Sequence, residues 1–132
     1  MKKIIVAAAA LVKDGKIFIA QRPATKQPPL VWEFPGGKPE AGETLQQALR
    51  RELQEELHID TIVGDFVMQT TYQYDFAEIE LNLFKVTMVD PNAAIRDEEH
   101  HATAWVNLSE LDKYDFAAAD KAIVAYLQKN GL

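Results

Sequence analysis

Residues 37–59 have the sequence GKPEAGETLQQALRRELQEELHI. Leucine and alanine recur in it at three- and four-residue steps, at positions 45, 48, 49, 53 and 57. This spacing predicts a helix over Thr44–Leu57 with one apolar face. Thr44 is a suitable N-cap residue because Gln47 follows three positions later, as in a capping box. Pro35-Gly36-Gly37 and the residues after it predict a loop that leads into the helix.

Three carboxylates lie close together at the end of this predicted helix. Glu52, Glu55 and Glu56 stand in an i, i+3, i+4 relation, so they share one patch. They repel each other, and acidic groups are unfavourable near a helix C-terminus. A solvated charged face, partly compensated by Arg50 and Arg51, is the ordinary alternative. The preceding glycines favour a pocket for Mg²⁺ and phosphate instead, because Mg²⁺ binds carboxylates and keeps coordination for water and phosphates.

The same residues resemble a known signature, the Nudix box, Gly-x5-Glu-x7-Arg-Glu-U-x-Glu-Glu-x-Gly-U, in which U is a bulky aliphatic residue. Gly37 is followed after five residues by Glu43, and after seven more by the run from Arg51 to Ile59. Every defined position agrees except one, because His58 stands where the pattern has glycine. Glycine there would suit a left-handed helix end. Histidine adopts this conformation at a cost of about 1 kcal/mol, so the departure concerns the helix cap and not the acidic residues.

The resemblance extends over nearly the whole chain. Ala20-Gln21-Arg22, Trp32 to Lys38, and Glu99-His100 followed by Trp105 are similar to the MutT-type branch, which includes CTP and oxidised-nucleotide hydrolases. The branch implies an α+β fold, an α/β/α sandwich in which a mixed β-sheet is packed between helices. It also implies hydrolysis of a nucleoside triphosphate to the monophosphate and pyrophosphate, with Mg²⁺ as cofactor and Mn²⁺ as a substitute. The leading expectation is a sanitising enzyme for 8-oxo-dGTP, or for CTP and modified dCTP.

Roles for the acidic residues follow from the resemblance, position by position. The metal ligands would be Gly37, through its carbonyl, and Glu52, Glu55, Glu56 and Glu99. These four glutamates are also the expected catalytic residues, and Glu99 is either an additional ligand or the general base. A lone glutamate in a loop is otherwise simply solvated. Arg51 and Glu43 would form an ion pair that ties the loop to the helix and orients the ligands.

Substrate recognition is expected at Arg22, Phe34, Lys38 and Asp120. Arg22 and Lys38 would contact phosphate, with an ordinary solvated cation as the alternative for each. Asp120 matches the position that reads the base in the branch, and a carboxylate favours a base edge with an amino group. Its alternative is an aspartate at the N-cap or in the first turn of a helix. Tyr72, Tyr74 and Phe76 would wall the base pocket or belong to the core.

The rest of the chain predicts the elements of a mixed sheet. Expected strands are Ile4–Val12 and Lys16–Gln21, joined by a turn at Asp14-Gly15, then Val31–Phe34, Thr61–Tyr74, Ile79–Val89 and Ala104–Val106. Expected loops are Pro23–Leu30 and Asp90–Thr103, and Ala117–Gln128 is expected to be an amphipathic helix. Strands alternating with helices indicate an α+β fold or an α/β sandwich.

Composition limits the partners. The chain has 132 residues, no cysteine and a net charge of -6, which predicts one domain over residues 1–132 and disfavours binding to a nucleic-acid polymer. Lys2 and Lys3 before an alanine-rich run resemble a short secretory signal. The alanine-rich run is better interpreted as the first strand of the hairpin at Asp14-Gly15, because cleavage after the alanines would remove that strand. No apolar run is long enough to span a membrane, so a cytoplasmic monomer acting on a small nucleotide is expected.

The same residues are compatible with other functions. Within the enzymes, the alternative is a Nudix hydrolase of a dinucleotide, a nucleotide sugar or ADP-ribose. Outside them, the domain could be a non-catalytic nucleotide-binding regulator, which the retention of all box carboxylates disfavours. A purely structural domain with a charged helix is a third hypothesis, and it predicts no binding of Mg²⁺.

Overall fold

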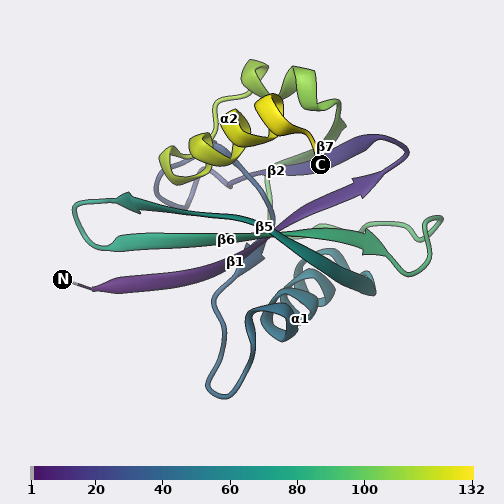
Figure 1. Ribbon diagram of the computed structural model, residues 1–132, viewed down its shortest axis with the longest axis horizontal. Helices are drawn as coiled ribbons and strands as arrows, with labels where there is room; N and C mark the ends of the chain where they lie inside the picture. The colour runs from purple at the N-terminus through teal and green to yellow at the C-terminus, as the bar shows by residue number, and fades with distance from the viewer. Residues whose placement is uncertain (1) are drawn as a thin grey trace.

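A computed structural model describes residues 2–132, and its sheet lies between two helices. The strands are β1 (Lys3–Lys13), β2 (Lys16–Gln21), β3 (Trp32–Glu33), β4 (Gly36–Gly37), β5 (Thr61–Gln73), β6 (Glu78–Met88) and β7 (Ala102–Val106). The helices are α1 (Leu45–Leu57) and α2 (Lys121–Asn130), with short 3-10 helices η1 (Leu108–Lys113) and η2 (Ala118–Asp120). Figure 1 shows α1 and α2 on opposite sides of the sheet, which confirms the expected α+β sandwich.

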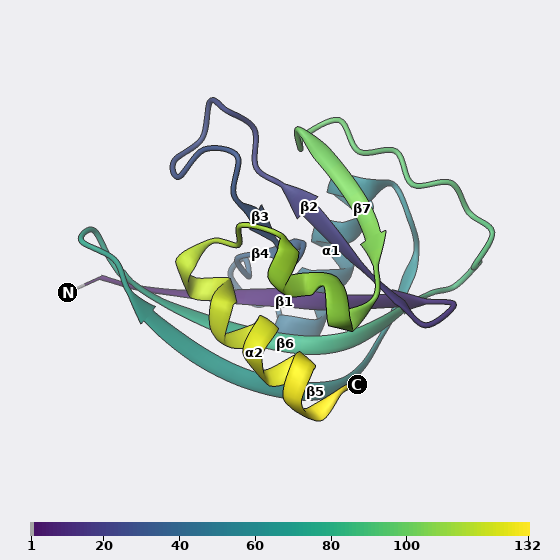
Figure 2. The same cartoon turned by 90° about the horizontal axis from the view of Figure 1, so that it is seen from above.

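The long strand β1 links the two halves of the sheet. The strand order is β3-β2-β1-β6-β5, with β4 paired to β1 and β7 paired to β2. From Lys3 to Leu11, β1 runs parallel to β6, and only its last two residues pair with β2. The predicted hairpin at Asp14-Gly15 is therefore confirmed but short. Figure 2 shows β2 and β7 leaving β1 at a steep angle to β5 and β6.

Alternation along β1 divides the core into two layers. Ala7, Ala9 and Leu11 face the layer that holds Leu49, Leu53 and Leu57 of α1. Ala8 and Ala10 face the other layer, with Ile123, Val124 and Leu127 of α2. Successive side chains of a strand point to opposite faces, so one alanine-rich strand serves both helices. Burying each of these three leucines of α1 contributes roughly 1.5–3 kcal/mol relative to exposure.

The ends of α1 agree with the sequence prediction. The Thr44 hydroxyl accepts from the backbone N–H of Gln47 at 3.1 Å, and the Gln47 side chain accepts from the N–H of Thr44 at 2.9 Å. At the other end, His58 is left-handed, with φ 56° and ψ 41°, and its N–H donates to the Gln54 carbonyl. Histidine thus takes over the helix-ending role of the expected glycine.

The glycines before α1 correct one expectation. Gly36 and Gly37 were expected in a loop, but they form the two-residue strand β4, opposite Ala8 and Ala7 of β1. A Cβ atom on Gly36 would lie 2.0 Å from the Ala7 carbonyl oxygen, so a side chain has no room there. The missing side chains allow two backbones to pair where a Pro-Gly-Gly run indicated a break.

The last helix begins later than expected. Ala117 donates to the Trp32 carbonyl at 2.9 Å, and Trp32 donates to the Asp115 carbonyl at 2.8 Å. These bonds tie the segment to β3, and η2 follows before α2 begins at Lys121. Asp120 consequently lies against β3 instead of inside a longer helix. No helix within residues 2–132 is long and apolar enough to cross a membrane.

Candidate active site

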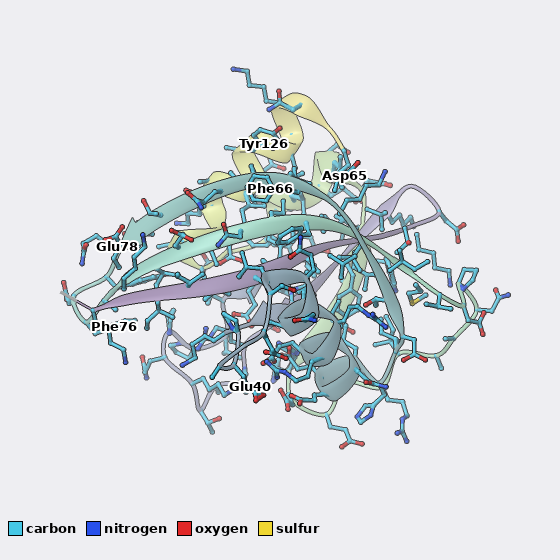
Figure 3. All side chains as sticks on the ribbon, turned by 60° about the horizontal axis from the view of Figure 1, so that its bottom comes forward. Glu40, Asp65, Phe66, Phe76, Glu78 and Tyr126 are labelled. Atoms are coloured by element: carbon cyan, nitrogen blue, oxygen red, sulfur yellow. The ribbon has the colours of Figure 1, made fainter. Side chains whose placement is uncertain are left out.

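A cleft of about 490 Å³ brings together most of the predicted site residues. Its lining includes Arg22, Phe34, Gly37, Lys38, Glu52, Glu56, Glu99 and Asp120. They come from the end of β2 and the residue after it, the segment from β3 to just past β4, α1, the loop before β7 and η2, which lie far apart in the sequence. Figure 3 shows Phe76 at the β5–β6 hairpin, at the far end of the sheet, and Glu40 in the loop that enters α1. Phe76 also lines the cleft.

The acidic end of the cleft is formed by Glu52 and Glu56, one turn apart on α1. Glu56 is largely buried, and its Oε2 has no hydrogen-bond partner within residues 2–132. Burial and the neighbouring charge of Glu52 together raise the pKa of Glu56 to about 8, with smaller upward effects from Glu99 and Glu33 and an opposing effect from His100. A buried oxygen without a partner among like charges is stabilised by a cation.

These residues fit Mg²⁺, which binds hard oxygen donors. Across residues 2–132, no three histidine or acidic side chains already converge as a complete metal site. The carboxylates line one cleft without closing around a point, which suits an ion that takes the rest of its coordination from water and phosphate. The pairing of Glu56 with Glu52 is therefore the part of the predicted ligand set with direct geometric support.

Glu55 lies outside this cleft. Its side chain is 59% exposed, and its Oε2 is 3.3 Å from Nη1 of Arg51. The i+3 step from Glu52 turns it toward the flank of α1, whereas the i+4 step keeps Glu56 over the cleft. Its predicted role as a metal ligand stays a prediction.

Arg51 holds the acidic loop and helix together, as expected. Its Nε and Nη2 bind the two carboxylate oxygens of Glu43 at 2.8 and 2.9 Å, and its Nη1 binds Glu52 at 3.0 Å. It also donates to the Lys38 carbonyl at 3.1 Å. The hydrogen bond from Arg51, with the N–H of Glu40, lowers the pKa of Glu43 to about 2, so Glu43 remains ionised. The bidentate pair fixes the approach of Glu52 to the cleft.

The other end of the cleft is apolar and centred on Asp120. Asp120 is buried, and its Oδ2 accepts from the Phe34 N–H at 3.0 Å. Burial raises its pKa to about 7. It sits at the N-cap of α2, but its side chain makes no capping bond, so the alternative of a capping aspartate does not hold. A carboxyl group buried at a cleft and not used by the helix is available to a ligand.

Aromatic side chains form the wall beside Asp120. Tyr74 and Phe76 stack with their ring centroids 5.3 Å apart, and both line the cleft, whereas Tyr72 does not. Phe76 is 68% exposed, so one of its faces is open. The Tyr74 hydroxyl accepts from the Ala119 N–H at 3.1 Å. The wall is apolar and flat, as needed to hold a base.

The cations differ in their surroundings. Arg22 binds Glu33 at 3.2 Å, and its Nε is buried without a partner within residues 2–132. Lys38 is exposed at the edge of the cleft. Either could reach a phosphate oxygen, and this role stays a prediction.

Sequence reasoning assigned no role to Glu33 and His100, which also line the cleft. The His100 ring binds Asp97 Oδ2 at 2.7 Å and Glu33 Oε2 at 3.3 Å. Burial alone would lower the pKa of His100, but the hydrogen bond to Glu33 and the charge of Asp97 raise it to about 9. The spacing Asp97-x-x-His100 was a visible signal, but the bond to Glu33 spans 67 residues and has no local signature.

Comparisons with known proteins agree with this arrangement. The family model described as the NUDIX domain matches residues 1–127. The chain is 41% identical over 120 residues to the CTP pyrophosphohydrolase of Escherichia coli (strain K12), covering 91% of this chain and 87% of that protein. It is 36% identical over 130 residues to the putative 8-oxo-dGTP diphosphatase 2 of Mycobacterium tuberculosis, covering 95% and 88%.

A solved structure has the same architecture. The solution structure of the E. coli ORF135 protein matches with a TM-score of 0.83 and 37% identity, covering 98% of this chain and 91% of that one. The match extends from β1 to α2, so it includes every element that contributes to the cleft.

Proposed function

The chain belongs to the NUDIX domain family and is a MutT-like nucleoside triphosphate pyrophosphohydrolase, and within that class we propose that it acts on CTP or a modified dCTP. The observation that carries the choice of base is Asp120. One oxygen of this buried carboxyl group is held by the Phe34 N–H, and the group faces the apolar end of the cleft. The edge of cytosine carries an amino donor and a ring-nitrogen acceptor, which would match the acceptor and the donor that this carboxyl group offers when it is neutral.

The cofactor proposed is Mg²⁺, with Mn²⁺ as a substitute. Bound at the acidic end, the ion would neutralise phosphate charge and lower the pKa of the attacking water. Glu52 and Glu56 would hold it, with the Gly37 carbonyl and Glu55 as further predicted ligands. Arg51 fixes the Glu52 carboxylate through the bond at 3.0 Å.

The remaining residues bind the substrate and receive the proton. Arg22 and Lys38 would contact the phosphates, and Phe34, Tyr74 and Phe76 enclose the base. Glu99 is exposed at the opening of the cleft, where it could accept a proton from the water that attacks phosphorus. The products are the nucleoside monophosphate and pyrophosphate.

An oxidised purine triphosphate is the second candidate. The similarity to a protein named as an 8-oxo-dGTP diphosphatase favours it, as does the amino group on the guanine edge, which a carboxylate also accepts. Dinucleotides, nucleotide sugars and ADP-ribose belong in the same test as non-triphosphate substrates.

A panel of nucleotides tests the proposal. The purified full chain is incubated with Mg²⁺ and CTP, 5-substituted dCTP, 8-oxo-dGTP, the ordinary triphosphates, ADP-ribose and a dinucleotide, and pyrophosphate and monophosphate are measured. We expect the largest kcat/KM for a cytosine-containing triphosphate. Stronger hydrolysis of 8-oxo-dGTP would replace the base assignment, and no pyrophosphate from any triphosphate would overturn the function.

The expected assembly and location also need tests. We propose a monomer that acts in the cytoplasm on free nucleotides as a single domain, since the net charge of -6 opposes binding to a nucleic-acid polymer. Light scattering after size-exclusion chromatography gives the oligomeric state. Cell fractionation gives the location.

A further inference from the structure

Both ring nitrogens of His100 face a carboxylate. Nδ1 lies 2.7 Å from Oδ2 of Asp97, and Nε2 lies 3.3 Å from Oε2 of Glu33. Only 5% of the His100 side chain is exposed, and Asp97 is 6% exposed. Since the partners are both acceptors, the ring donates from both nitrogens and joins the two acids. The ring therefore connects β3 to the loop that precedes β7.

Asp97 in turn fixes the backbone around Glu99. Its second oxygen, Oδ1, accepts from the N–H groups of both Glu99 and His100 at 2.9 Å. One carboxylate thus holds the turn with Oδ1 and is held by the imidazole through Oδ2. Asp97 therefore links the His100 ring to the backbone of Glu99.

Glu99 lies on a long loop, so it needs such a support. The segment between β6 and β7 contains no helix or strand from residue 89 to residue 101. Its backbone is tied to other elements through Arg96, which donates to the Leu57 carbonyl, and His101, which donates to the Gln21 carbonyl. The side chain of Glu99 is exposed and lines the cleft near Glu56. A displacement of about 1 Å at a reacting group can cost on the order of 100-fold in rate.

We propose that His100 is a positioning residue, whose ring ties Asp97 to Glu33 and thereby sets Glu99 over the acidic end of the cleft. The inference rests on the proposed function, because it concerns the step in which Glu99 acts. His100 itself does not act on the substrate in this scheme. An apolar side chain of similar size would fill the same space but leave the buried carboxylate of Asp97 without its partner.

Four variants separate positioning from packing. His100→Leu removes both bonds. His100→Asn keeps an N–H donor near the place of Nδ1, toward Asp97, and His100→Gln extends one toward Glu33. Asp97→Asn keeps Oδ1 for the turn but replaces the acceptor of the ring. His101→Leu is the matched control, because this exposed neighbour lies outside the cleft.

Steady-state kinetics give the first readout. We expect His100→Leu to lower kcat by about 10- to 100-fold with KM changed less than about threefold, because substrate contacts remain. His100→Asn should recover more of kcat than His100→Gln, since the bond to Asp97 is the one that reaches Glu99. Asp97→Asn should resemble His100→Leu, and it keeps the test valid should the leucine variant fail to fold. A wild-type kcat in His100→Leu, or a loss confined to KM, would overturn the proposal.

Hydrogen exchange gives a readout that needs no activity. In His100→Leu and Asp97→Asn, the amides of Glu99 and His100 should exchange at least about 10-fold faster, whereas His101→Leu should match the wild type. Unchanged exchange in both variants overturns the positioning role even where kcat falls. If the wild-type protein hydrolyses no triphosphate, the proposed function fails, and the exchange of these two amides alone decides whether His100 holds the loop.

Discussion

A Cβ atom on Gly37 would lie 2.4 Å from the carboxyl carbon of Glu52. The side chain of Glu52 therefore occupies the space beside the backbone of Gly37 that a Cβ atom would take in any other residue. This contact lets Glu52 turn into the cleft beside Glu56. Gly36 is restricted differently, because its Cβ would meet the backbone of Ala7 at 2.0 Å.

The two neighbouring glycines should therefore respond differently to alanine. Gly37→Ala meets the end of a flexible side chain, so we expect the fold to persist while Glu52 is displaced and kcat falls at least about 10-fold. Gly36→Ala meets backbone and should lower the free energy of unfolding by on the order of 3 kcal/mol. Urea unfolding and kinetics on both variants check this. A Gly37→Ala protein with full activity, or one as destabilised as Gly36→Ala, contradicts it.

Local pattern explains what could be predicted from the sequence. The spacing of Leu49, Leu53 and Leu57, and the pair Thr44 and Gln47, predicted α1 and its N-cap because these interactions lie within one helix. The acidic patch was found in the same way. The Arg51–Glu43 pair came with the family resemblance, and its separation of eight residues allows the ion pair. Family resemblance added Asp120 and Glu99, which spacing alone could not have selected.

Long-range contacts were the part that could not be predicted. The bond from Phe34 to Asp120 spans 86 residues and the contact of His100 with Glu33 spans 67. The parallel pairing of β1 with β6 also has no local signal, because parallel strands need a distant connection. Gly36-Gly37 was expected in a loop. These residues form β4 only by pairing with β1, which lies about 30 residues earlier in the chain, and that pairing leaves no local signal.

Glu56→Gln tests the metal site. The change keeps the shape of the side chain but removes the charge beside Glu52, so kcat should fall by more than about 100-fold, beyond the usual effect of a supporting residue. Mg²⁺ should raise the Tm of the wild type. At a Mg²⁺ concentration of 100 times the Kd for the ion, the gain in the free energy of unfolding is about 2.7 kcal/mol, and chelation should remove it. Thermal scans with and without Mg²⁺ check it, with Gln54→Glu on the exposed flank as the control. An equal shift of Tm in Glu56→Gln would exclude Glu56 as a ligand.

His58→Gly tests the helix end. His58 is left-handed at φ 56°, a conformation that glycine adopts without the steric cost, so the variant should gain up to about 1 kcal/mol in stability. The extra freedom of glycine in the unfolded chain reduces this gain. Activity should be unchanged because His58 is exposed and outside the cleft. Loss of stability in the glycine variant would show that the histidine side chain itself supports the helix end.

Asp120 should make stability depend on pH. Burial raises its pKa from 3.8 to about 7, so the folded chain binds this proton more tightly than the unfolded chain does. Its contribution is fully present below pH 3.8 and is lost as pH rises toward 7, at a cost on the order of 4 kcal/mol. Asp120→Asn should therefore be more stable than the wild type at pH 8.5 and not at pH 4. Urea unfolding of both proteins in the presence of a chelator at pH 4 and pH 8.5 checks this. The same difference in the free energy of unfolding between variant and wild type at both pH values would contradict it.

The same titration should change the choice of base. Below pH 7 the neutral carboxyl group of Asp120 offers one donor and one acceptor, which match the ring nitrogen and amino group of cytosine. Above pH 7 the carboxylate only accepts, which suits the two donors on the edge of 8-oxoguanine. The ratio of kcat/KM for CTP over 8-oxo-dGTP should therefore fall by about 10-fold from pH 6 to pH 8. Asp120→Asn keeps a donor and an acceptor at every pH, so its ratio of kcat/KM for CTP over 8-oxo-dGTP should not change with pH. If kcat/KM for the two substrates changes in parallel with pH in the wild type, the proton on Asp120 has no role in the choice of base.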